Sequence, residues 1–106
     1  MTASTMRARL EAVFAAHPER AETALALAQL CLREKDYAAA REYARQAVAR
    51  QPEYSAALLV GGQAARGMGE ADDARTWFTR AREAAQAHGD KQIERQVAVF
   101  LKRKDS

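Results

Sequence analysis

The feature that most constrains this chain is a period of 34 residues. Pro18 and Pro52, each followed by Glu, are separated by that distance. The same offset relates several further sets of residues: Arg7, Arg41 and Arg75; Leu25 and Leu59; Gln29 and Gln63; Ala40 and Ala74; and Ala47 and Ala81. A fixed period of this kind marks a repeat architecture, in which each unit buries its apolar face against its neighbours.

Each unit carries two stripes of apolar or small residues at helical spacing, joined by a short turn. In the first unit, Lys35-Asp36 forms the turn, Asp36 can cap the helix that follows, and Pro52 ends the unit. Glycines mark the turn of the second unit, at residues 67–70. The stripes are Ala24, Leu27, Ala28 and Cys31, then Ala40, Ala44, Ala47 and Val48, in the first unit, and Leu58, Gly61, Gly62 and Ala65, then Ala74, Phe78 and Ala81, in the second.

The flanking segments complete the pattern. Upstream, residues 4–17 are predicted to form one helix that corresponds to the second helix of a repeat. Since no first helix precedes it, this segment is half a repeat. Repeats follow at 21–54 and 55–88, and a turn at 88–90 precedes a closing helix at 89–103. We therefore predict one all-α domain over 1–106, an antiparallel, right-handed array of six helices.

Composition excludes other classes. The 106 residues include 26 Ala and only seven aromatics, which disfavours an all-β fold. A net charge of +3 is spread along the chain and does not indicate a polyanion binder. The single Cys cannot form an internal disulfide, and there is no apolar run long enough to span a membrane, so we expect a cytoplasmic protein without a membrane segment.

The spacing resembles the tetratricopeptide repeat (TPR), whose signature is Trp-x-x-Leu-Gly-x-x-Tyr, then Ala-x-x-x-Phe, Ala and Pro. Small residues replace the large aromatics of the first helix, and Gln86 stands where the second unit should have proline. The positions that match are Leu27, Ala40, Ala47, Pro52, Gly62, Ala74, Phe78 and Ala81.

The resemblance implies a concave groove lined by the first helix of each pair, which binds an extended peptide or a partner helix. Carried over by position, the exposed groove would include Val60 and, near the end of the chain, Ile93, Glu94 and Val97. The groove residues that we predict to bind are Leu25, Gln29, Leu32, Arg33, Leu59, Gln63 and Arg66. The leucines would form an apolar ladder and the glutamines an amide ladder, while the two arginines could hold a carboxylate. The clamp that some TPR domains use for a terminal carboxylate is absent, since Leu25 and Val60 occupy two of its positions.

No residue pattern indicates an enzyme, a cofactor or a metal site. Cys31 lies on a packing stripe, and neither His17 nor His88 has a second ligand at metal spacing. Trp77 is expected to pack on the final helix, with an exposed binding hot spot as the alternative. The expected function is a non-enzymatic adaptor for an unidentified protein or peptide. Two alternatives remain: a self-associating homodimer, and weak nucleic-acid binding, which acidic neighbours disfavour, through Arg41, Arg45, Arg75, Arg80 and Arg82.

Overall fold

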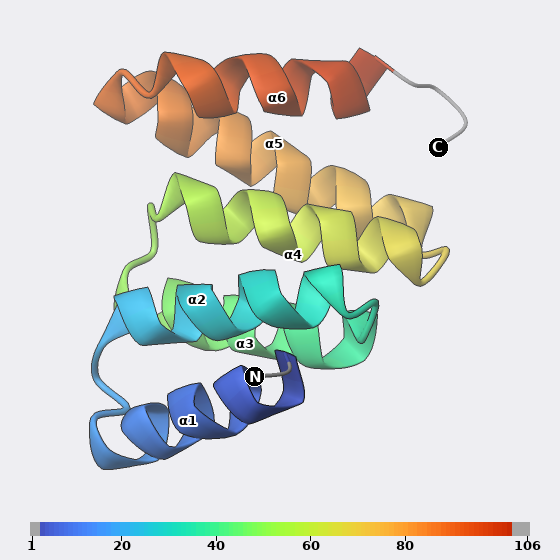
Figure 1. Ribbon diagram of the computed structural model, residues 1–106. Coiled ribbons are helices and arrows are strands. Elements are labelled where there is room, and N and C mark those ends of the chain that lie inside the picture. The colour runs from blue at the N-terminus through green and yellow to red at the C-terminus, as the bar shows by residue number, and fades with distance from the viewer. Residues whose placement is uncertain (1–2, 103–106) are drawn as a thin grey trace.

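The computed structural model describes residues 3–102, with side chains from residue 5 on, and contains six α-helices in that range. Successive helices pack antiparallel in a stack (Figure 1). Their bounds are α1 Ala3–Ala16, α2 Ala21–Arg33, α3 Tyr37–Arg50, α4 Ser55–Gly67, α5 Ala71–His88 and α6 Lys91–Lys102. The predicted all-α helical repeat array is confirmed. The ends of the predicted domain, residues 1–2 and 103–106, and with them the last residue of the closing helix, lie outside the described residues.

The helices form two layers. α4 contacts both α2 and α6, so these three helices lie side by side and form the first layer. The helices that follow α2 and α4 in the chain, α3 and α5, form the second layer. Figure 1 looks onto the α2 and α4 side, with α3 behind α2. α3 packs against α2 and α4, and α5 packs against α4 and α6. The face of α2, α4 and α6 that points away from the second layer is therefore not covered by another helix of the described residues.

The helix ends follow the predicted turn chemistry. The Asp36 side chain accepts a hydrogen bond from the backbone N–H of Ala39 at 3.3 Å, and Asp90 accepts one from Ile93 at 3.2 Å. Each aspartate thus satisfies an amide that the first helical turn leaves free. Two predicted turns differ by one residue, because the helices continue through Gly67 and His88 before they end.

Close contact between α4 and α5 explains why α4 carries two glycines, Gly61 at the leucine position and Gly62 at the glycine position of the repeat signature. A Cβ atom at Gly61 would lie 2.2 Å from the Trp77 ring, and one at Gly62 would lie 2.5 Å from the Phe78 ring. The volume that a large residue on α4 would fill is therefore filled from α5. Phe78 in turn stacks on Phe100 of α6, with ring centroids 4.6 Å apart.

An ion-pair cluster recurs at the repeat period between the second helix of one unit and the turn of the next. Arg7 contacts Asp36 at 3.0 Å and also Glu34. One period later, Arg41 contacts Asp73 at 2.9 Å and also Glu70, the residue equivalent to Asp36. These carboxylates raise the pKa of both guanidinium groups. At Arg7 and Arg41, the arginine period seen in the sequence is thus a packing feature of the array, whereas Arg75, one period later, is exposed.

Candidate peptide-binding groove

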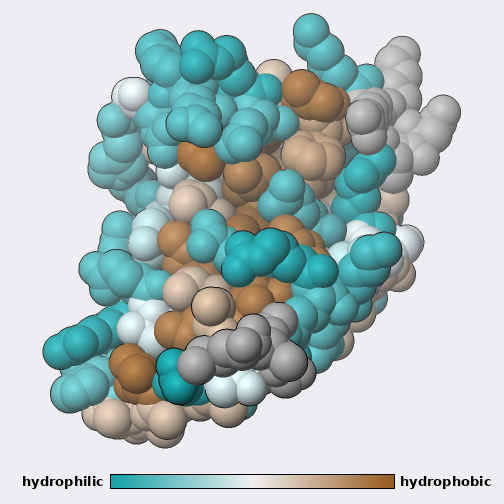
Figure 2. Space-filling view, in the orientation of Figure 1, coloured by the Kyte–Doolittle hydropathy of each residue, from teal (hydrophilic) through white to brown (hydrophobic). Residues whose placement is uncertain are grey.

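The face shared by α2, α4 and α6 is the candidate site. Figure 2 shows apolar surface gathered along the middle of this face, with hydrophilic surface on both sides. The half-buried apolar side chains of these three helices that pack against the core include Leu25, Leu32, Ile93, Phe100 and Leu101. A partly exposed apolar strip between polar borders can be covered by a partner.

The predicted apolar ladder is only partly present, which corrects the sequence interpretation. Leu59 is 7% exposed and Val60 is 3% exposed, so both belong to the core. Val97, expected near the groove, is also fully buried. The physical reason is that α4 has helices on several sides, which bury more than the single stripe of an isolated amphipathic helix. Leu25 remains half-buried beside the core.

The predicted amide ladder keeps access to solvent. Gln29 on α2 is exposed, and Gln63, one period later on α4, is half-buried. Neither side chain has a hydrogen-bond partner among residues 5–102. Each can therefore offer both a donor and an acceptor to a ligand.

Four of the seven predicted residues meet in one cavity of about 480 Å³, which we name the basic cleft. It lies where α2 and α4 end, beside the start of α3 and the end of α6. The residues that line it are Leu32, Arg33, Lys35, Tyr37, Gln63, Arg66, Gly67 and Phe100. Leu25, Gln29 and Leu59 do not line it. Sequence reasoning missed Lys35, Tyr37 and Phe100 as site residues; Lys35 could have been noticed because it follows Arg33 by two residues in the chain.

Aromatic side chains shape the basic cleft. The Arg66 guanidinium carbon lies 5.4 Å from the centroid of the Phe100 ring, an arrangement in which the ring attracts the cation. The Nε of Arg66 is shielded from solvent and has no hydrogen-bond acceptor. Gly67 leaves room for the Tyr37 ring, which lies 2.6 Å from where a Cβ would stand. The Phe100 ring therefore holds Arg66 at the cleft wall, while Gly67 makes room for Tyr37 in the same lining.

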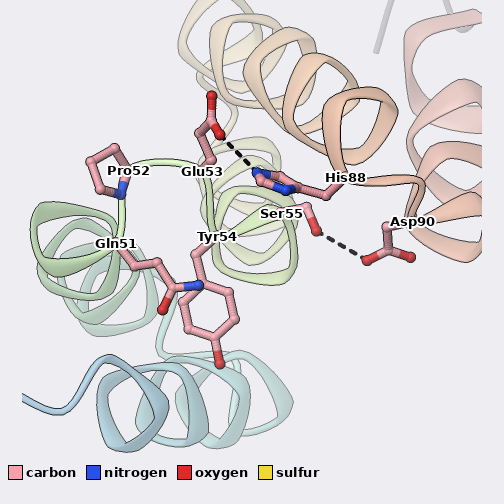
Figure 3. Close-up of a pocket in the computed structure, with 7 residues that line it drawn as sticks. All are labelled: Gln51, Pro52, Glu53, Tyr54, Ser55, His88 and Asp90. Carbon is pink, nitrogen blue, oxygen red and sulfur yellow. Dashed lines mark hydrogen bonds and ion pairs between the residues drawn. The ribbon is translucent and has the colours of Figure 1, made fainter.

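A second cavity, of about 690 Å³, lies at the other end of α4, and its charged lining residues include Glu53 and Asp90 in place of the cations of the basic cleft (Figure 3). The His88 ring is 2.7 Å from a carboxylate oxygen of Glu53, and the Ser55 hydroxyl donates to Asp90 at 3.1 Å. No Lys or Arg side chain lines this cavity. Tyr54 points from the same loop toward α2 in Figure 3, and its burial raises the pKa of the phenol.

Two residues that could have carried function are packing residues. Cys31 is fully buried, and that burial raises the pKa of its thiol, which disfavours the reactive thiolate. Trp77 is 6% exposed, and its Nε1 donates to Asp73 at 3.3 Å, so it is buried and is not an exposed hot spot. Its ring lies against Gly61 of α4, whereas the prediction placed it on the final helix. Among residues 5–102 no three His, Cys, Asp or Glu side chains form a group that could hold a metal ion.

Comparison with known proteins identifies the family. Residues 32–92, more than half of the chain, match the tetratricopeptide repeat family, and residues 7–55 match a second description of the same repeat. The chain belongs to the tetratricopeptide repeat family. TPR repeats generally mediate protein–protein interaction, and TPR folds are typically non-enzymatic interaction modules.

Two similar proteins agree with this assignment. The TPR repeat-containing protein PA0015 of Pseudomonas aeruginosa is 35% identical over 66 residues, which are 62% of this chain and 63% of that protein. The match thus spans less than two thirds of the relative. The solution structure of protein BPP2914 from Bordetella parapertussis is 30% identical, with a TM-score of 0.78 over 92% of this chain and 84% of that one. In the part of this TPR chain that the structure describes, none of the helices combines the length and apolar character needed to cross a membrane.

Proposed function

We propose that this protein is a non-enzymatic adaptor of the cytoplasm that binds an extended peptide or a partner helix along the face of α2, α4 and α6. The observation that carries the proposal is the convergence of Leu32, Arg33, Gln63 and Arg66 from two repeats on one cavity of that face.

The groove offers the three kinds of contact that a peptide ligand needs. Leu25 and Leu32 can each lose further apolar area to water, and a fully covered leucine contributes about 1.5–3 kcal/mol. Gln29 and Gln63 can pair with backbone amides of an extended ligand. Arg33 and Arg66 can form charge-assisted hydrogen bonds with carboxylates. Because Leu59 is buried, we assign it to the core beneath the groove and not to the ligand contacts.

A display selection tests the proposal. Random peptides would be selected on the wild type, and their affinities measured for Gln29→Trp, which places a large ring in the groove at an exposed position. The matched control is Gln96→Trp, at an exposed position of α6 equivalent to Gly62 and so on the side of the second layer. We expect Gln29→Trp to weaken binding about tenfold or more, and the control to leave it unchanged. Selected peptides that bind both variants equally well would refute groove binding.

Self-association is a second candidate, favoured by an asymmetry between the two ends of the array. On α1, Met6 and Val13 of the second-helix stripe are 49% and 43% exposed, because no first helix precedes them. On α6, the exposed outer side includes Gln92, Arg95 and Gln96, so it is mostly polar, and Val99, which is 52% exposed, is the one large apolar residue exposed there among the described residues. Sedimentation over a range of concentrations separates the candidates, since only self-association through α1 predicts a dimer that Met6→Glu dissolves.

A further inference from the structure

We infer that the basic cleft binds the side-chain carboxylates of an acidic segment in the partner protein. The inference rests on the proposed function, because it names the chemistry of the ligand in the same groove. It concerns one end of the groove, where α2 and α4 end and where Arg33, Lys35 and Arg66 converge.

The charge of the basic cleft is uncompensated. Three cations line it, and the lining includes neither Asp nor Glu. Among residues 5–102, none of the three forms an ion pair, whereas Arg7 and Arg41, the cations of the repeat packing, each contact at least two carboxylates. Where arginine serves the fold of this protein, it is paired. The unpaired cations of the cleft therefore remain available to an external anion.

The helix dipole alone does not explain why these residues gather in the basic cleft. A basic residue in the last turn of a helix is favoured by the helix dipole, and this accounts for the presence of Arg33 and Arg66. It does not account for Lys35, which follows α2 in a left-handed turn conformation with φ of 63°. Nor does it account for Phe100, which comes from another helix and faces the guanidinium of Arg66.

The held guanidinium suits a carboxylate. A planar guanidinium matches the two oxygens of a carboxylate, and a side chain that packing has already fixed loses less entropy on binding. Arg66 is the half-buried anchor of the cleft, while Arg33 and Lys35 are exposed and can reach a second acid. Two or three cations around one hollow fit a segment with more than one Asp or Glu.

The opposite end of α4 offers such a segment no Arg or Lys side chain. The second cavity there is lined by Glu53, Asp90 and His88, and the His88 ring already contacts Glu53. α4 has 13 residues, and at about 1.5 Å per residue it separates the two ends by about 20 Å, a span of about six extended residues. An acidic stretch of a bound peptide is therefore directed to the end of the groove where α2 and α4 terminate.

Selection from two random libraries tests the inference. In one library the peptides are fused through their C-termini, so that only side chains supply carboxylates; in the other the C-termini are free. We expect the wild type to enrich Asp and Glu in the fused library. The strongest fused-library peptide, resynthesised with an amidated C-terminus, should bind the Arg33→Glu, Lys35→Glu double variant about tenfold or more weakly, since a salt-sensitive ionic contact is lost.

The control has the same change in net charge. In the Arg75→Glu, Arg82→Glu double variant, both positions are exposed on α5 and outside the cleft, and we expect an affinity within about twofold of the wild type. Circular dichroism will check that both variants are folded. Equal loss of binding in the two double variants would show a net-charge effect and overturn the inference. Enrichment of acids only where the C-termini are free would overturn it in favour of a terminal carboxylate.

The outcomes separate this inference from the function on which it depends. If peptides are selected whose binding Gln29→Trp abolishes, but without enrichment of acids, the cleft inference is wrong and groove binding stands. If no selected peptide is sensitive to Gln29→Trp, groove binding fails and the inference fails with it.

Discussion

Replacement of Gly61 by alanine is expected to destabilise the protein, although alanine is the better helix former. Gly61 lies inside α4, where the Cβ of an alanine would stand 2.2–2.5 Å from three atoms of the Trp77 ring. The ring cannot move freely, because Trp77 is 6% exposed and donates a hydrogen bond to Asp73. Either the ring or the α4–α5 contact must shift.

The expected magnitude follows from two opposing terms. Extra methyl groups forced into a packed core cost about 1–3 kcal/mol. Glycine in the middle of a helix is less favourable than alanine by about 0.5–1 kcal/mol, and this amount is regained. The net loss is about 1 kcal/mol, which lowers the melting temperature of a domain of this size by about 4–8 °C.

Urea and thermal unfolding followed by circular dichroism measure the effect. The substitution Ala8→Gly, at an exposed position inside α1, calibrates the propensity term alone. In a Trp77→Leu background, where the ring is absent, Gly61→Ala should no longer destabilise the protein. A melting temperature that rises in the wild-type background, by the amount the calibration predicts, would refute the close approach of α4 and α5.

Three further predictions concern the core and its charges. Ala74→Glu should unfold the protein, because a charge at this 4% exposed helix contact has no partner; an unchanged melting temperature would contradict the packing. Leu59→Glu should also unfold it, and a folded variant defective only in peptide binding would restore Leu59 to the groove surface. Cys31 should react with alkylating reagents only on unfolding. Since burial raises the pKa of its thiol in the folded state above the value of about 8.5 in the unfolded chain, stability should fall as the pH rises above that value, and less so in Cys31→Ala.

Much of the fold was predictable because local signals agree with the repeat period. Asp36 caps α3, and Gly89, with φ of 70°, ends α5, so residues visible in the sequence mark real helix boundaries. The stripes at helical spacing identified most of the core, including Leu27, Leu58 and Phe78. What the period could not show was that aromatics of α5 occupy the space above glycines of α4.

The candidate site was less predictable, because exposure depends on neighbours that are distant in the sequence. Leu59 adjoins the predicted stripe, and an isolated helix would expose it. Residues 56–62 are an unbroken run of apolar residues and glycine, a pattern of burial on all sides that outweighs a one-sided stripe. Phe100 was missed because its contact with Arg66 joins two helices that are distant in the sequence, and helical spacing does not show such a contact.

The most direct test of the account is chemical-shift mapping of the labelled protein with a peptide from the display selection. If the face of α2, α4 and α6 is the binding surface, the largest amide changes will fall along it, with Gln29, Leu32, Gln63 and Arg66 among the most affected. Changes that instead concentrate on the outer face of α3 and α5, or on α1, would show that the partner binds elsewhere and would contradict the central claim.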